Sequence, residues 1–171
     1  MKYTEIAQKL IKSPKQRLAV ICYAQYDGKI LFINRTREPF SGFLVPPGGK
    51  VEDGEGIEEA IRREFREETG LELNNLRLKM VTSEEGPEHY NWVLFIFVAE
   101  LNSDKFIQSD EGELVWVEKD KIFEENLSPI DKALARYILD GSNKVKLAQI
   151  KYSEDKSIED LKIEDLDSIF E

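Results

Sequence analysis

Apolar residues that alternate with polar ones, or that form short unbroken runs, predict β-strands along much of this chain. The runs RLAVICYAQY at 17–26 and KILFINR at 29–35 are typical strands, and Asp27-Gly28 between them suits a tight hairpin turn. Further strands are expected at 76–83, 90–101 and 114–118, the first two separated by EEGPE. The pattern therefore predicts a β-sheet at the centre of the fold.

Helical periodicity appears in segments with recognisable ends. The segment 56–69 repeats apolar residues at helical spacing and stops at Gly70, the residue type expected at a left-handed C-cap. The segment 129–139 follows a Ser-Pro capping signature and precedes a glycine, and a short helix is expected at 3–11. Strands interleaved with helices predict an α/β fold, in which a mixed β-sheet is flanked by helices as an α/β/α sandwich.

A single domain is expected to span 1–143, with 144–171 as an acidic C-terminal extension. Within the extension, KVKLAQIKY is compatible with an added edge strand. The acidic remainder carries spaced apolar residues from Ile158 onward and is expected to be either a short docking helix or a mobile tail.

The helix expected at 56–69 carries acids where its apolar stripe should continue. At about 100° per residue, Glu64 and Glu68 share a face with Ile61. Burying an ionised carboxylate without a partner costs several kcal/mol, and Glu67 is their neighbour at helical spacing. Because the ligands on offer are hard oxygens without His or Cys nearby, the trio predicts a site for Mg²⁺, with Mn²⁺ as an alternative.

The alternative interpretation is a solvated acidic face with i,i+4 partners. Glu58, Glu59, Arg62 and Arg66 fit it well. This interpretation leaves the acids on the apolar face unexplained, since the polar face already has its own charges.

The segment GKVEDGEGIEEAIRREFREETGL, residues 49–71, resembles the signature of the Nudix hydrolases. That signature reads Gly, five residues, Glu, seven residues, Arg-Glu, an apolar residue, any residue, Glu-Glu, any residue, Gly, apolar. All its constrained positions are filled, by Gly49, Glu55, Arg63, Glu64, Phe65, Glu67, Glu68, Gly70 and Leu71. The resemblance implies the Nudix fold, in which this box forms a loop, a helix and a loop beside a mixed sheet.

The resemblance also implies a role for each residue of the box. It assigns metal ligation to Glu64, Glu67, Glu68 and the carbonyl of Gly49, orientation of a carboxylate to Arg63, and structural support to Glu55 and Gly70. A further acid usually comes from a later loop, where SDEGELVWV offers Glu111, with Glu113 second, as a general base or extra ligand.

Substrate-binding candidates lie outside the box. Asn126, near the start of the last helix, stands where family members that clean the nucleotide pool read a base edge. Lys50 and Arg35 flank the expected site and are candidates to bind phosphate oxygens, while Phe43 is a candidate to stack on a base. An ordinary turn, core or surface role remains the alternative for each of these residues.

The net charge of −10 argues against a non-specific nucleic-acid surface and against binding to an anionic membrane. A free nucleotide bridged by metal ions remains compatible with it. The single Cys22 excludes a disulfide scaffold, and the N-terminus lacks the apolar core of a signal peptide, so a cytoplasmic protein is expected.

These features together predict Mg²⁺-dependent hydrolysis of a nucleoside diphosphate linked to a further group. An oxidised nucleoside triphosphate such as 8-oxo-dGTP, cleaved to the monophosphate and pyrophosphate, is the leading substrate. ADP-ribose is the alternative, because Pro87 lies sixteen positions after Leu71, a spacing associated with ADP-ribose hydrolysis in the family. A non-catalytic Nudix nucleotide sensor is the alternative of another class, and a homodimer stays open.

Overall fold

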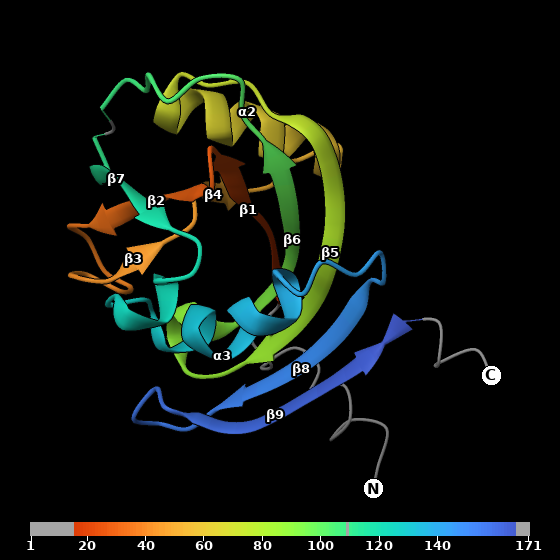
Figure 1. Cartoon of the computed structure of the whole chain (residues 1–171). Helices are drawn as coiled ribbons and strands as arrows, with labels where there is room; N and C mark the ends of the chain where they lie inside the picture. Colours follow the sequence, from red (N-terminus) through yellow and green to blue (C-terminus); the bar gives the residue numbers. More distant parts are fainter. Residues whose placement is uncertain (1–15, 109, 167–171) are drawn as a thin grey trace, which may run out of the picture.

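The computed structural model describes residues 16–108 and 110–166, which form one mixed sheet flanked by helices (Figure 1). The strands are β1 (Arg17–Tyr26), β2 (Lys29–Arg35), β3 (Leu44–Val45), β4 (Gly48–Lys50), β5 (Asn74–Glu85), β6 (Trp92–Glu100), β7 (Gly112–Glu118), β8 (Lys146–Tyr152) and β9 (Ile158–Asp165). Their order in the sheet is β3-β2-β1-β6-β5-β8-β9, with β4 paired to β1 and β7 to β2. The pairs β1–β6 and β5–β8 are parallel, and the remaining pairs are antiparallel.

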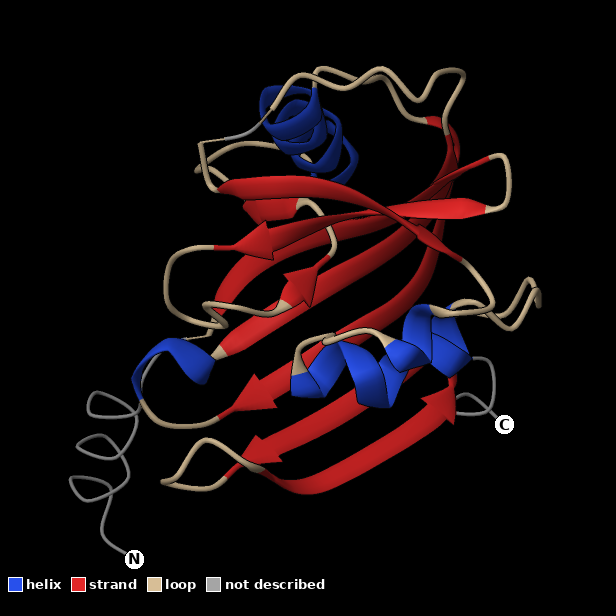
Figure 2. Cartoon of the chain, turned by 60° about the vertical axis from the view of Figure 1, so that its left-hand side comes forward, coloured by secondary structure: helices blue, strands red, loops and turns tan. Residues whose placement is uncertain are grey.

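The helices lie on opposite faces of this sheet. They are α2 (Ile57–Thr69) and α3 (Pro129–Ile138), with 3₁₀ turns η1 (Glu88–Tyr90) and η2 (Ile122–Glu124). Figure 2 shows α2 at the upper end of the strands and α3 lying across the lower ones. The sandwich expected from the sequence is thereby confirmed.

Because side chains alternate between the two faces of each strand, the buried apolar residues form two clusters. One, the α2 cluster, packs against α2, and the other, the α3 cluster, packs against α3. On β1, Val20 and Cys22 pack with α2, whereas Ile21, which lies between them, and Tyr23 pack with α3. On β2, Leu31 belongs to the α2 cluster and Phe32 to the α3 cluster. Successive side chains point to opposite faces of a strand, so the apolar runs at 17–26 and 29–35 are those of strands buried on both sides.

The sequence placed most of these elements correctly. β1 and β2 have the expected bounds, and the strands expected at 76–83, 90–101 and 114–118 are present as β5, β6 and β7. The helix expected at 3–11 lies outside the described residues. In the part of the chain that the structure covers, no helix has the length and apolar character needed to cross a membrane.

The tail was predicted less well. KVKLAQIKY does contain a strand, but β8 is not at the edge, because β5 flanks it on one side and β9 on the other. The helix or mobile tail expected after it is wrong for residues 158–165, which form β9. Leu161 and Ile163 alternate with charged residues and pack against the α3 cluster, a period of two that indicates a half-buried strand.

Polar contacts fasten the β8–β9 hairpin to the rest of the sheet. The Tyr152 hydroxyl donates a 3.2 Å hydrogen bond to buried Glu84. At the other end of β8, Lys146 and the buried Lys79 both donate to Asp140, at 2.6 and 3.1 Å. The hairpin is therefore anchored to both β5 and the end of α3.

Strand pairing also brings the expected site together. β1 pairs with β2 at Gln25 and Tyr26, and with β4 from Ala19 to Ile21, so the connection from β2 folds back beside β1. This places Gly48 and Gly49 of β4 next to α2, while β7 runs the length of β2 on the other side.

Candidate active site

The acid-bearing helix α2 is positioned by its apolar face and by its two ends. Ala60, Ile61 and Phe65 are fully buried against the sheet. Gly70 ends the helix in the left-handed conformation, with φ of 73°, and donates its N–H to the Arg66 carbonyl at 2.8 Å. The last turn of α2 is thus held rigidly over β4.

The three box acids of α2 differ sharply in exposure. Glu68 is 7% exposed, and its Oε2 accepts a 2.8 Å hydrogen bond from the backbone N–H of Gly48. The side chain of Glu64 is 17% exposed, whereas that of Glu67 is 61% exposed. The prediction that Glu68 interrupts the apolar face is confirmed; Glu64 lies at the margin of that face and Glu67 outside it.

Gly49 provides the space that Glu64 occupies. A Cβ placed on Gly49 would lie 2.5 Å from Oε2 of Glu64 and 2.7 Å from Oε1. Any other residue at this position would displace the carboxylate. The absence of a side chain at Gly49 thus leaves the space in which the Glu64 carboxylate lies.

Arg63 organises the acids around it. Its Nε and Nη2 hold Glu55 at 2.7 and 2.9 Å, its Nη1 reaches Glu64 at 2.9 Å and Glu67 at 3.3 Å, and Nη2 also donates to the Lys50 carbonyl at 3.1 Å. These bonds use all five N–H donors of a guanidinium. Arg63 is thus a fixed scaffold for carboxylates, with no donor left for a ligand.

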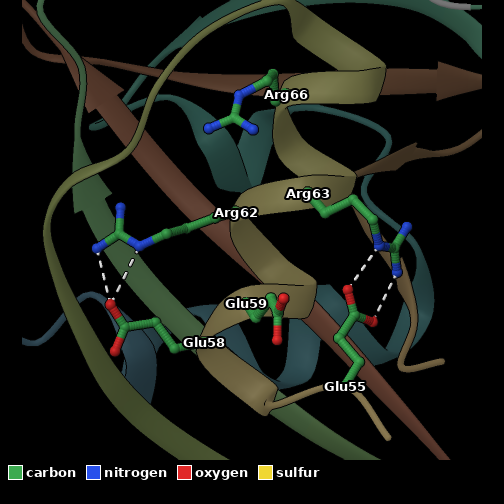
Figure 3. A pocket seen from close by; sticks show the side chains of 6 residues that line it. All are labelled: Glu55, Glu58, Glu59, Arg62, Arg63 and Arg66. Atoms are coloured by element: carbon green, nitrogen blue, oxygen red, sulfur yellow. Dashed lines mark hydrogen bonds and ion pairs between the residues drawn. The ribbon is translucent and has the colours of Figure 1, made fainter. Parts of the chain in front are cut away.

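Figure 3 shows that Arg62 and Arg63 extend to opposite sides of α2, with Arg63 directed at Glu55. The hollow drawn there has a volume of about 600 Å³ and is lined by Glu55, Glu58, Glu59, Arg62, Arg63 and Arg66. These residues form ion pairs along the outside of the helix, including Arg62 with Glu58 at 2.9 Å. The outer face of α2 therefore matches the solvated charged surface that was the alternative interpretation, while the box acids lie beyond it.

Burial and neighbouring charges shift the pKa values of these acids in different directions. Burial raises the pKa of Glu68 to about 9; the Gly48 N–H lowers it, and the carboxyls of Glu111 and Glu64 raise it further. Burial also raises the pKa of Glu64, against the opposing effect of Arg63. By contrast, hydrogen bonds from Arg63 and from the Glu52 backbone lower the pKa of Glu55 to about 2.

Glu111 reaches this cluster from the turn that precedes β7. Its carbonyl accepts hydrogen bonds from the Thr36 N–H at 3.3 Å and from the Thr36 hydroxyl at 3.2 Å. Its carboxyl lies close enough to Glu68 and Glu64 to raise the pKa of both. The structure thus brings Glu111 beside the box acids, whereas Glu113 is an exposed residue paired with Asn34 across β7 and β2.

The donor set has the chemistry of a hard divalent cation site. Glu68, Glu64 and Glu111 offer carboxylate oxygens around a buried position, the ligand type that Mg²⁺ and Mn²⁺ prefer. Among the described residues, no three acidic, His or Cys side chains already stand in a metal-binding arrangement. Glu64 and Glu67 instead face the Arg63 guanidinium.

Two of the remaining candidates lie in or contact the loop after β2, and the third lines a separate hollow. Asn126 donates a 3.0 Å hydrogen bond to the Gly42 carbonyl and so fixes the loop after β2. Phe43, half-buried in the same loop, accepts from the Arg35 N–H at 3.0 Å. Lys50 lines a separate hollow of about 400 Å³ beside Arg17.

Two relationships in the site were not found from the sequence. The bond from Gly48 to Glu68 depends on the pairing of β4 with β1, which no local pattern reveals. The contact of Arg35 with Glu111, at 3.6 Å, depends on the register of β2 and β7. Hydrophobic periodicity predicts that the segments of β2 and β7 are strands, but it carries no information on the register in which they pair.

The site thus consists of a strand with two glycines, β4, packed against the acidic helix α2 beside a mixed sheet. The sequence profile of the NUDIX domain matches residues 15–138, and the chain belongs to the Nudix hydrolase family. The protein is accordingly a pyrophosphohydrolase that acts on nucleoside diphosphate derivatives, and enzymes of this family generally use divalent metal ions.

Three similar proteins illustrate the relationship. The uncharacterized Nudix hydrolase YvcI of Bacillus subtilis is 33% identical over 125 residues, covering 70% of this chain and 77% of YvcI. The ADP-ribose pyrophosphatase of Methanocaldococcus jannaschii is 52% identical over 54 residues, 32% of each chain. The crystal structure of the mutator MutT protein from Bacillus halodurans aligns with a TM-score of 0.74 and 29% identity, covering 86% of this chain and 97% of that one.

Proposed function

We propose that the protein hydrolyses the pyrophosphate link of a nucleotide with Mg²⁺ held by Glu64, Glu67, Glu68 and Glu111, together with the Gly49 carbonyl. The observation that carries the proposal is the placement of Glu68. It is a buried carboxylate fixed by the Gly48 N–H, with the carboxyls of Glu64 and Glu111 as neighbours. A buried cluster of acids is unfavourable without a compensating cation.

The chain's own residues prepare the site for in-line attack on a phosphorus atom. Arg63, clamped by Glu55, orients Glu64 and Glu67 before any ligand arrives. The bound divalent ion supplies positive charge to offset the phosphates and makes water more acidic. Glu111, half-exposed at the edge of the cluster, is the residue we assign to accept the proton of the attacking water or to act as a further ligand.

We propose a nucleoside triphosphate as the substrate, with an oxidised purine nucleotide such as 8-oxo-dGTP leading. The products are the monophosphate and pyrophosphate. Two features support this choice: the alignment with nearly the whole MutT protein of B. halodurans, and Asn126, which is fixed against the loop at Gly42 near the start of α3. Phe43, in the same loop, is the residue proposed to contact the base.

ADP-ribose is the second candidate. It is favoured by the local 52% identity to the ADP-ribose pyrophosphatase of M. jannaschii, over about a third of each chain. Pro87, whose position suggested this substrate, lies at the start of η1 between β5 and β6. Cleavage of ADP-ribose would give AMP and ribose 5-phosphate. We place either activity in the cytoplasm, since the only thiol, Cys22, is buried and unpaired.

The test is product identification with purified protein and Mg²⁺. The panel contains 8-oxo-dGTP, the ordinary dNTPs, ADP-ribose and dinucleoside polyphosphates. Pyrophosphate released from a triphosphate supports the first substrate, and AMP with ribose 5-phosphate supports the second. A protein that cleaves none of them, with or without Mg²⁺, contradicts the proposal.

Matched variants then separate metal ligation from general charge effects. Glu68→Gln should lower turnover by roughly a hundredfold or more while circular dichroism shows an intact fold. Glu58→Gln removes the same charge from the outer face of α2, where Glu58 pairs with Arg62, and should change turnover little. Undiminished turnover in Glu68→Gln would exclude this acid as a ligand.

A further inference from the structure

Arg35 stands at the end of β2, directly against the acidic cluster. Strand pairing aligns it with Gly112, the first residue of β7, and its Nη1 lies 3.6 Å from Oε2 of Glu111. Thr36 fixes the Glu111 backbone through two hydrogen bonds to its carbonyl. The pairing of β2 with β7 and the two Thr36 hydrogen bonds therefore hold the guanidinium of Arg35 beside the carboxylate of Glu111.

The environment of Arg35 differs from that of Arg63. Whereas all five donors of Arg63 are engaged, Arg35 donates through Nε to the Arg37 carbonyl at 3.3 Å and faces Glu111 at a distance too long for a hydrogen bond. Among the described residues, no partner accepts from its Nη2. The side chain is 24% exposed, so Arg35 is a cation near the acids that still has donors to offer.

Glu111 has two competing uses. It faces Arg35 on one side, and Glu68 and Glu64 on the other. A divalent cation shared with the box acids attracts the Glu111 carboxylate more strongly than a monovalent guanidinium across 3.6 Å does. When Glu111 serves the cation, Arg35 loses its counter-charge and becomes available to an anion.

We propose that Arg35 is a phosphate-binding residue whose charge Glu111 masks until metal is bound. The proposal rests on the proposed function in one respect, namely that Glu111 contributes to the cation site. It adds an order of binding: metal first, then the phosphates of the nucleotide. A nucleotide that binds before the metal would meet the acids and an Arg35 whose charge is offset by Glu111. A nucleotide that binds after the metal meets a guanidinium that is available to its phosphates.

The first experiment measures binding of inorganic pyrophosphate by calorimetry in EDTA, where no metal takes part. Glu111→Gln should tighten binding about three- to fivefold over the unchanged protein, because Arg35 is unmasked. In an Arg35→Gln background the same Glu111→Gln change should leave the affinity unaltered. Glu113→Gln removes an equal charge at an exposed site two residues further along the chain, on β7, and should give no gain.

The second experiment measures Mn²⁺ binding without any nucleotide. Arg35→Gln should tighten Mn²⁺ binding by a similar factor, since Glu111 no longer has a competing partner. Arg37→Gln, a change of equal charge at an exposed neighbour, should not. Loss of the Arg35→Gln effect in the Glu111→Gln background would support the coupling.

Two results would overturn the inference. One is a Glu111→Gln gain in pyrophosphate affinity that is equally large with and without Arg35, which would indicate a general charge effect. The other is no gain at all. Failure of Mn²⁺ to bind the unchanged protein would instead contradict the proposed metal site, while the measurements in EDTA would still decide whether Arg35 and Glu111 are coupled.

Discussion

The carboxylate of Glu64 lies against the α-carbon of Gly49, in the space that a Cβ at that position would need. We expect Gly49→Ala to push this carboxylate away and to weaken Mn²⁺ binding about tenfold or more, the range seen when the support of a metal ligand is lost. Titration calorimetry measures the effect. Gly56→Ala is the matched control, since an added Cβ there meets nothing closer than 4.0 Å. Equal Mn²⁺ affinity in both variants would show that Glu64 is not a ligand.

Arg63→Lys tests the guanidinium as an organiser of acids. A lysine keeps the charge but cannot hold Glu55 with two nitrogens while a third reaches Glu64. We expect a ten- to hundredfold loss in kcat/KM, which is the range found when a residue that orients a metal ligand is replaced. Arg66→Lys changes a neighbouring arginine whose partner is the exposed Glu72, and should retain activity. If both variants remain fully active, charge alone is sufficient at Arg63.

Glu84 makes stability depend on pH in a defined direction. Burial raises its pKa from 4.5 to about 7, with hydrogen bonds from Thr82 and Tyr152 lowering it and Asp131 raising it. The folded protein thus holds this proton more tightly than the unfolded chain. The proton bound to Glu84 therefore adds about 3 kcal/mol to the free energy of unfolding. This contribution is complete below about pH 4.5 and is lost as the pH rises through 7.

Replacement of Glu84 by glutamine removes this titration. Urea unfolding at pH 5 and pH 8 should show a smaller loss of stability over that interval in Glu84→Gln than in the unchanged protein. Asp131, whose pKa burial raises to about 6, titrates in both proteins and contributes to the pH dependence that remains in Glu84→Gln. The control is Glu85→Gln at the exposed next position. Identical pH dependence in all three proteins would mean that Glu84 stays ionised in the fold.

Asp140 is the shared partner of two lysines that are largely buried, and these hydrogen bonds contribute to a pKa well below its ordinary value against the opposing effect of burial. Asp140→Asn should lower the free energy of unfolding by about 2–3 kcal/mol, because removing one partner strands a buried charge. Glu159→Gln breaks the exposed pair with Lys151 and should cost less than about 0.5 kcal/mol. Chemical denaturation of both variants gives the comparison, and equal losses would show that the Asp140 cluster is no stronger than a surface pair.

The sequence predicted what is local and missed what depends on pairing. Helix α2, its cap at Gly70 and the burial of Glu68 follow from residue spacing over a few turns. The strand β9 was missed because the acidic composition of 153–171 outweighed the alternation of Leu161 and Ile163. The position of β8 between two strands could not be predicted, since one of its partners, β5, lies more than sixty residues away in sequence.

The candidate site shows the same division. The box acids and Arg63 could be grouped as candidates because they share one helix, and the structure brings Glu111 beside them. That Arg35 contacts Glu111, and that Asn126 binds the backbone at Gly42, are consequences of tertiary structure. For Arg35 and Asn126 the residue type makes each a candidate, but the residue that each contacts is known only from the fold.

The parallel pairing of β5 with β8 has a consequence for synthesis of the chain. Met80 aligns with Lys146, so the outer side of β5 has no strand partner until the ribosome has released the C-terminal hairpin. A nascent polypeptide that has reached only α3 presents a row of open amide and carbonyl groups to other nascent chains. The β8–β9 hairpin, residues 146–165, thus covers an edge of β5 that would otherwise be open to aggregation.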